Sequence, residues 1–286
     1  MMWLILALLS AFFEAVKDVV SKHNLKANDE YVVTWSLTFF TAAFLTPLLF
    51  IIEIPPLNQQ FWIALLIGAI MNAVIALLYI KAIKLADLSL AVPLVALTPL
   101  FMLLTSPLIV GEYPNFFDGI GVFLIVMGSY LLNIKEKSQG YLAPFKALLH
   151  QPGSKLMLLV AFLWSITTNF DKIGVQNSSP IFWVFALLTS MSVLLLPVLL
   201  HKTSNPKRQI IQYLPMLMAT GFFNALGVIF QMQALTMTLV VQVIALKRTS
   251  VLMSVLFGYF IFKEKDIQER FLGAAIMMGG VLFITL

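Results

Sequence analysis

The two halves of this chain repeat one pattern, with an offset of about 150 positions. Pro47 aligns with Pro197 and, after a gap of two residues, Glu112 aligns with Glu264. The other matching residues are Ala11–Phe12 with Ala161–Phe162, Asn72 with Asn224, Ala82 with Ala234, Gly121 with Gly273, and Gly128 with Gly280. Each copy contains five long apolar stretches. If every stretch crosses a membrane, the odd number inserts the second copy upside down, and inverted repeats of this kind are typical of secondary transporters.

The composition indicates an integral membrane protein. Of the 286 residues, 60% are hydrophobic and 11% are charged, whereas about 25% of the residues in a soluble domain are charged. Cysteine is absent, which excludes disulfides and thiolate sites. The three histidines lie far apart in predicted loops, so we expect no metal and no other cofactor. The net charge of +5 comes from loops on one membrane side, so we expect no nucleic-acid partner.

The apolar stretches predict an all-α membrane protein with ten transmembrane helices, arranged as two inverted five-helix repeats. We expect a first repeat over 1–134, a cytoplasmic linker over 135–154 and a second repeat over 155–286. The predicted spans are 3–22, 31–52, 60–83, 88–110, 116–134, 155–175, 180–200, 211–236, 239–262 and 267–286.

Basic residues predict the orientation, because Lys and Arg accumulate in cytoplasmic loops. Most of them fall in alternate loops, which we expect to be cytoplasmic. Both termini then lie outside, and the protein is a multi-pass component of the plasma membrane, the inner membrane in a bacterium. The basic residues of this side are Lys22, Lys26, Lys81, Lys84, Lys135, Lys137, Lys146, Lys155, Lys202, Lys207, Arg208, Lys263, Lys265 and Arg270.

Short motifs recur in the second part of each copy. The first copy has Thr98–Pro99, Gly111–Glu112, Gly119, Gly121 and Gly128, and the second has Ala234, Ser250, Lys263–Glu264, Gly273 and Gly279–Gly280. This pattern resembles the EamA family of the drug/metabolite transporter superfamily, over nearly the whole chain. The resemblance implies a ten-helix permease and not an enzyme, often an exporter of small metabolites, and it leaves the substrate open. The second copy departs from the pattern where Lys263 replaces Gly111.

Lys247 and Arg248 lie in the middle of the predicted ninth span. A charge at the centre of a membrane helix costs about 2.5–3.5 kcal/mol on insertion scales, so such residues are candidates for function. Arg binds carboxylate or phosphate with a planar fork, and Lys acts as a point charge. The pair is similar to that of the sugar-phosphate translocators, which implies an anionic or zwitterionic substrate. The aligned Val95 and Ala96 are apolar, so we expect an asymmetric site. Alternatively, the cations pair with acids on another helix.

Glu14, Lys17 and Asp18 share one face of the first span, because they are spaced by three and four residues. Glu14 resembles the membrane glutamate of the small multidrug resistance transporters, which binds a proton or a cation. We expect these residues to couple transport to a proton or to balance charge. A neighbouring ammonium group stabilises the ionised carboxylate, which opposes protonation. The alternative is therefore a self-neutralised helix face that partners Lys247 and Arg248.

Other polar and aromatic residues are weaker candidates. Asn72, Asn224 and Gln231 are predicted to hydrogen-bond a substrate, although membrane Asn more often links helices. Gln242 is expected to line the same cavity, and Trp35, Tyr79 and Trp164 could form its wall. We expect Glu112 and Glu264 to cap the helices that follow them, and the repeated glycines to mark close helix contacts within the chain or in a homodimer.

The sequence therefore predicts a secondary-active transporter, an exporter or exchanger that works by alternating access between the two repeats. It contains no nucleotide-binding motif, so we expect transport to run on a proton gradient or on a counter-substrate. One alternative is an exporter of cationic or aromatic drugs that uses Glu14. Another is a membrane scaffold or receptor without transport activity.

Overall fold

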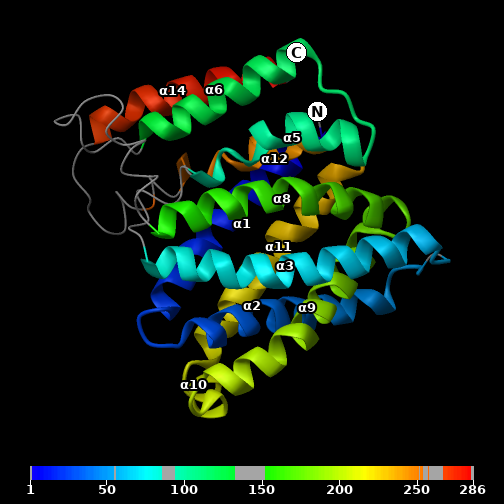
Figure 1. Ribbon diagram of the computed structural model, residues 1–286, viewed down its shortest axis with the longest axis vertical. Coiled ribbons are helices and arrows are strands. Elements are labelled where there is room, and N and C mark those ends of the chain that lie inside the picture. The colour runs from blue at the N-terminus through cyan, green and yellow to red at the C-terminus, as the bar shows by residue number, and fades with distance from the viewer. Residues whose placement is uncertain are drawn as a thin grey trace. The chain divides into compact units, whose positions relative to one another are not determined.

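A computed structural model describes residues 2–54, 56–85, 94–132, 152–250, 252–253, 257 and 267–284. Glu264 and nearly all of the predicted linker lie outside these residues. The described secondary structure is helical (Figure 1): α1 (Met2–Asn24), α2 (Glu30–Leu45), the 3-10 helix η1 (Thr46–Phe50), α3 (Gln59–Leu85), α5 (Thr98–Ile109), α6 (Phe116–Leu132), α8 (Pro152–Gln176), α9 (Pro180–Lys202), α10 (Pro206–Gln212), α11 (Leu214–Leu235), α12 (Val240–Lys247) and α14 (Ile267–Ile284).

Within the described residues, five helical segments are long and apolar enough to cross a membrane. They are Glu30–Phe50, Gln59–Ala82, Pro152–Gln176, Pro180–Lys202 and Leu214–Leu235, and shorter apolar helices cover Thr98–Ile109, Phe116–Gly128 and Ala275–Ile284. The helix α1 is equally long, but it contains Glu14, Lys17, Asp18 and Lys22. The prediction of an all-helical membrane protein is confirmed, and the number of ten spans stays a prediction.

Polar side chains and prolines set the helix boundaries. Asp29 begins α2, because its Oδ1 atom accepts a hydrogen bond of 2.9 Å from the Tyr31 N–H. Ser179 caps α9 in the same manner through Phe182, and Pro180 occupies the first position of that helix. Proline suits this position because the missing N–H would have no partner within the helix.

The described chain folds into two compact units that each combine both sequence repeats. Unit 1 contains residues 1–77 and 167–238, and unit 2 contains residues 78–166 and 239–286. Two of the three boundaries along the chain fall inside the helices α3 and α8, and the third falls between α11 and α12.

In unit 1, α11 packs against α1 and α2, and α2 also packs against α9. Small residues allow these close approaches, as is usual between membrane helices. A Cβ atom on Gly221 would lie 2.5 Å from the Cβ of Phe40 on α2, and one on Gly227 would lie 3.7 Å from the backbone nitrogen of Glu14 on α1. The backbone that carries Glu14 is therefore held directly against α11.

In unit 2, α6 and α14 lie side by side (Figure 1). A Cβ atom on Gly121 would lie 2.7 Å from the carbonyl oxygen of Gly280, and one on Gly280 would lie 2.6 Å from that of Gly121. Likewise, a Cβ atom on Gly128 would lie 2.5 Å from the carbonyl oxygen of Gly273. The aligned glycines of the two repeats thus meet crosswise, which confirms the expected close contact within the chain.

Candidate functional site

The fourth helix of the second repeat is interrupted at the two basic residues. The helix α12 ends at Lys247, Arg248 is its C-cap, and a turn at Arg248 and Thr249 precedes the helical residue Ser250. The prediction of an uninterrupted helix over 239–262 is therefore wrong at this point. The Thr249 N–H bonds to the Leu246 carbonyl three residues earlier, which tightens the last turn. Cations are stabilised at this position, because the C-terminus of a helix carries partial negative charge.

The first repeat has the same turn at the aligned position. Residues Ala96 and Leu97 form a turn before α5, and the Leu97 N–H bonds to the Leu94 carbonyl at 3.1 Å. The matching bond from Thr249 to Leu246 is 3.0 Å. The two repeats therefore share a broken helix, and only the second copy places cations at the break. Discontinuous helices supply substrate and ion sites in many transporter folds.

Arg248 packs on an aromatic pair. Its guanidinium carbon lies 5.5 Å from the centre of the Trp164 ring, and that ring lies 5.1 Å from the Tyr79 ring. This distance allows a cation–π attraction, which strengthens when the cation is removed from water. Arg248 is only 7% exposed, whereas Lys247 is half-buried. Trp164 thus contacts both Arg248 and Tyr79, all within unit 2.

The third aromatic residue of the expected wall lies in unit 1. Trp35 stacks on Phe39 with a centroid distance of 4.6 Å, and its Nε1 atom donates to the Ser192 carbonyl oxygen at 3.0 Å. These contacts place Trp35 in the packing of α2 on α9.

Glu112 caps the helix that carries the basic pair. The Val240 N–H donates to Glu112 Oε2 at 2.7 Å, while Leu239, the N-cap residue of α12, provides no side-chain cap. Glu112 was expected to cap the helix that follows it, so the prediction of capping is confirmed but the predicted helix is wrong. The preceding Gly111 adopts a φ of +75°, the left-handed conformation that glycine tolerates best.

Asn115 caps α6 in place of Glu112, and Asp118 extends this contact to α12. The Asp118 N–H donates to Asn115 Oδ1, and the Asn115 N–H donates to Asp118 Oδ2, both at 2.8 Å. This reciprocal pair is a capping box. Asp118 is 1% exposed, and its Oδ1 atom accepts a 2.6 Å hydrogen bond from Gln242 Nε2. Gln242, which was expected to line a cavity, therefore anchors the first turn of α12.

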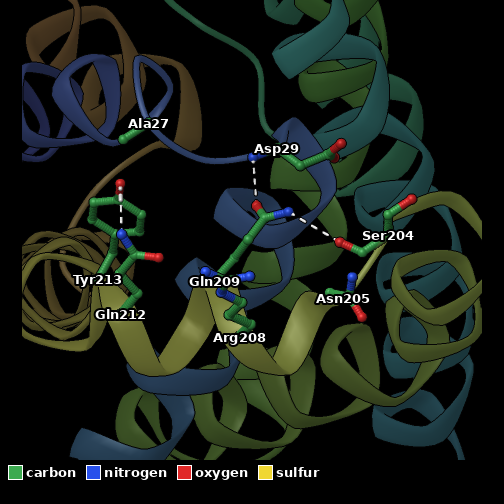
Figure 2. Close-up of a pocket in the computed structure, with 8 residues that line it drawn as sticks. All are labelled: Ala27, Asp29, Ser204, Asn205, Arg208, Gln209, Gln212 and Tyr213. Atoms are coloured by element: carbon green, nitrogen blue, oxygen red, sulfur yellow. Dashed lines mark hydrogen bonds between the residues drawn. The ribbon is translucent and has the colours of Figure 1, made fainter.

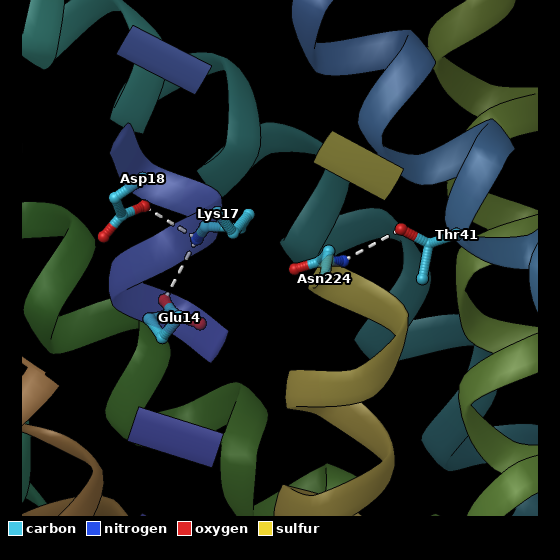
Figure 3. A network of polar contacts seen from close by, with 5 residues as sticks. All are labelled: Glu14, Lys17, Asp18, Thr41 and Asn224. Atoms are coloured by element: carbon cyan, nitrogen blue, oxygen red, sulfur yellow. Dashed lines mark hydrogen bonds and ion pairs between the residues drawn. The ribbon is translucent and has the colours of Figure 1, made fainter. Parts of the chain in front are cut away.

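The charged residues of α1 form a compact ion cluster (Figure 3). Lys17 Nζ lies 3.1 Å from Glu14 Oε1 and 2.9 Å from Asp18 Oδ1. The side chains of Lys17, Glu14 and Asp18 are 9%, 14% and 36% exposed. The predicted shared face and the predicted Glu14–Lys17 pair are both confirmed. The cluster belongs to unit 1 and the basic pair belongs to unit 2, and a direct pairing of the two stays a prediction.

Of the predicted substrate-binding amides, Asn224 has a clear structural partner. Its Nδ2 atom donates to Thr41 Oγ1 at 3.0 Å, which joins α11 to α2 (Figure 3). This contact favours the interhelical reading of Asn224. Gln231 is 6% exposed on α11, and Asn72 is half-buried on α3. Their contacts with a substrate stay predictions.

Comparison with known proteins gives a match to a family and matches to solved structures. The model described as the EamA-like transporter family matches residues 1–134 and 151–286. A solved structure titled "Crystal structure of protein" is similar to this chain with a TM-score of 0.73 and 16% sequence identity, covering 99% of this chain and 95% of that one. At this identity the match establishes the fold alone. No curated protein matched the chain.

Proposed function

Because this chain belongs to the EamA-like transporter family, a family of membrane transporters, we propose that it is a secondary-active carrier of a small anionic or zwitterionic metabolite. The position of Lys247 and Arg248 is the observation that supports an anionic or zwitterionic substrate. Both residues lie where α12 ends in a turn, and interrupted helices of this kind supply substrate sites in many transporter folds. A carboxylate or phosphate group of the substrate would bind there.

The surroundings of Arg248 support a bound anion. Arg248 is 7% exposed, and a charge-assisted hydrogen bond to a carboxylate or phosphate is stronger away from water than in it. The Trp164 ring adds a cation–π contact, 5.5 Å from the guanidinium carbon. Trp164 and Tyr79 also provide an apolar surface that fits the carbon skeleton of a small metabolite.

We assign the transport cycle to alternating access between the two repeats, with export or exchange as its direction. Glu14 or Asp18 would bind a proton or balance the charge of the substrate, and Lys17 would remain paired with the other carboxylate. Asn72, Asn224 and Gln231 would orient the remaining polar groups of the substrate. For Asn224 this requires the hydrogen bond to Thr41 to open or to be shared.

The second candidate function is export of cationic compounds through Glu14. The ion pair between Glu14 and Lys17 weighs against it, because a cationic substrate would have to displace an ammonium group 3.1 Å away.

The test is thermal stabilisation of the purified protein by a panel of amino acids, organic acids, sugar phosphates and aromatic cations. The Lys247→Ala, Arg248→Ala double variant is measured beside a Lys202→Ala, Lys207→Ala control, which removes two exposed charges. We expect an anion or zwitterion to stabilise the native protein and the control but not the first variant. Any stabilising compound is then tested for uptake or exchange in proteoliposomes. Stabilisation of both variants by cations alone would overturn the assigned site.

A further inference from the structure

An open pocket lies in unit 1, at the ends of several membrane helices (Figure 2). Its volume is about 440 Å³. It is lined by Ala27, Asp29, Ser204, Asn205, Arg208, Gln209, Gln212 and Tyr213. These residues come from the loop between α1 and α2 and from the segment that joins α9 to α11 through α10.

Internal hydrogen bonds fix the shape of this pocket. Gln209 bridges its two walls, because its Oε1 atom accepts from the Asp29 N–H at 2.9 Å and its Nε2 atom donates to the Ser204 carbonyl at 3.3 Å (Figure 2). Gln212 Nε2 donates to the Tyr213 hydroxyl at 3.2 Å. The pocket is therefore preformed and lined mainly by neutral polar groups.

The ionised groups of the lining are Arg208 and Asp29. The Asp29 carboxylate already accepts hydrogen bonds through Oδ1 from the Tyr31 N–H and from Thr203 Oγ1. Arg208 is exposed and presents the planar fork that matches a phosphate group. Along the chain, more basic than acidic residues flank the lining segments: Lys22, Lys26, Lys202 and Lys207 against Glu30.

The position along the helices indicates the source of the phosphate. Asp29 begins α2, Ser204 follows the end of α9, and Tyr213 precedes α11, and these three helices belong to apolar segments that can cross a membrane. Their ends therefore lie at the level of the lipid headgroups. Tyrosine is enriched at this level, because its ring is apolar and its hydroxyl is polar.

Exposed apolar side chains continue from the pocket. Ile211 is 63% exposed and follows Arg208 by three positions on α10, which places both on one side of the helix. Leu214, at the start of α11, is 36% exposed, and Leu200, near the end of α9, is 62% exposed. A free phosphate ion would gain nothing from these side chains, whereas the acyl chains of a lipid would cover them.

We propose that this pocket binds the headgroup of an anionic phospholipid. Arg208 binds the phosphate, the amide and hydroxyl groups of Gln212, Asn205 and Tyr213 bind the polar remainder of the headgroup, and the acyl chains lie over Ile211 and Leu214. This site is separate from Lys247 and Arg248 and does not depend on the transported substrate.

The test compares two neighbouring basic residues of α10. Arg208 lines the pocket, whereas Lys207 is also exposed but does not line it. Arg208→Gln and Lys207→Gln remove the same charge. The native protein and both variants are titrated with phosphatidylglycerol and with phosphatidylcholine, and bound lipid is measured by native mass spectrometry. A further arm replaces the lipid with inorganic phosphate. Unfolding temperatures in lipid-free detergent show whether each variant is folded.

We expect the native protein to retain phosphatidylglycerol over phosphatidylcholine, and Arg208→Gln to weaken this binding by about tenfold, the effect of losing one direct hydrogen-bonded contact to a charged group. Lys207→Gln should bind as the native protein does. Equal losses in both variants, or no loss in Arg208→Gln, would overturn the proposal in favour of diffuse charge attraction. Stabilisation by inorganic phosphate at concentrations comparable to those of the lipid would overturn the assignment to a lipid. If Arg208→Gln does not fold, Tyr213→Phe, which removes only the hydroxyl, must weaken the lipid binding instead.

Discussion

Glu112 Oε2 accepts a hydrogen bond of 2.7 Å from the backbone N–H of Val240, 128 positions away in the other repeat. Through this contact a loop residue of the first copy fixes the start of the helix that ends in Lys247 and Arg248. A capping side chain normally belongs to its own helix, but Leu239 at the start of α12 has no polar side chain to serve. The glutamate of the glycine–glutamate motif in the first copy therefore caps a helix of the second copy, a contact we call the Glu112 clamp.

Replacement of Glu112 by alanine should destabilise the protein by about 1 kcal/mol, the usual effect of losing a helix cap. It should also weaken ligand binding at Lys247 and Arg248, because α12 positions both residues. Glu112→Gln keeps an acceptor oxygen and should be milder. Glu53→Ala, at an exposed position outside the helices, is the control. Unfolding temperature and ligand-induced stabilisation measure both effects, and identical behaviour of Glu112→Ala and the control would contradict the clamp.

The crossing of α6 and α14 should not tolerate a methyl group. Gly121→Ala would place a Cβ atom 2.7 Å from the Gly280 carbonyl oxygen, so the helices must separate, with a loss of about 1–3 kcal/mol typical of overpacking. Gly279→Ala is the matched control, because no atom lies within 4 Å of its added Cβ. The unfolding temperature of Gly121→Ala should be clearly lower than that of Gly279→Ala. A stable Gly121→Ala protein would mean that the two helices are not in backbone contact.

Arg248→Lys should reduce ligand affinity even though it keeps the positive charge. Lysine lacks the planar group that stacks on Trp164 and binds an anion through two parallel hydrogen bonds. The cation–π term alone, about 0.5–2 kcal/mol, corresponds to a loss of roughly 2- to 30-fold in affinity. Binding titration of the stabilising ligand measures the change, with Arg208→Lys as the control. Full affinity in Arg248→Lys would reduce the role of Arg248 to that of a point charge.

Lys17→Met should destabilise the protein, because it removes the ammonium group that pairs with both the Glu14 and the Asp18 carboxylates. Breaking a fully buried ion pair costs about 3–5 kcal/mol. Asp18 is 36% exposed, so solvent screening should lower this loss to about 1–3 kcal/mol. The double variant Glu14→Gln, Lys17→Met should recover part of the loss, whereas the exposed control Lys26→Met should be neutral. Absence of recovery in the double variant would show that Lys17 acts through packing and not through its charge.

The sequence predicted most helices and the ion cluster on α1, because these features depend on local signals. Apolar length, Pro180 and the spacing of Glu14, Lys17 and Asp18 act within one helix. The contact between α6 and α14 was predictable as well, since glycines recur at aligned positions. The pairing of Glu112 with α12 was not predictable, because nothing in the local sequence indicates which helix a loop carboxylate will reach.

The turn at Arg248 and Thr249 could be predicted from the first repeat but not from the residues around it. In the first copy, the ring of Pro99 opposes a helical bond to the carbonyl of Val95, which explains the turn at Ala96 and Leu97. The second copy has no proline at the aligned position, so its sequence appears continuous. Alignment of the two repeats places the turn at Ala96 and Leu97 on Arg248 and Thr249, where the second turn is observed.

The two compact units each combine segments from both repeats, and this arrangement has a consequence for biosynthesis. The helix α1 packs on α11 and α6 packs on α14, so neither early helix has its final partner until the ribosome has nearly completed the chain. The first half must therefore wait in the bilayer with its glycine surface and ion cluster covered only by lipid or by the insertion machinery. Premature termination would leave a fragment that cannot finish folding, and quality-control proteases should remove it quickly.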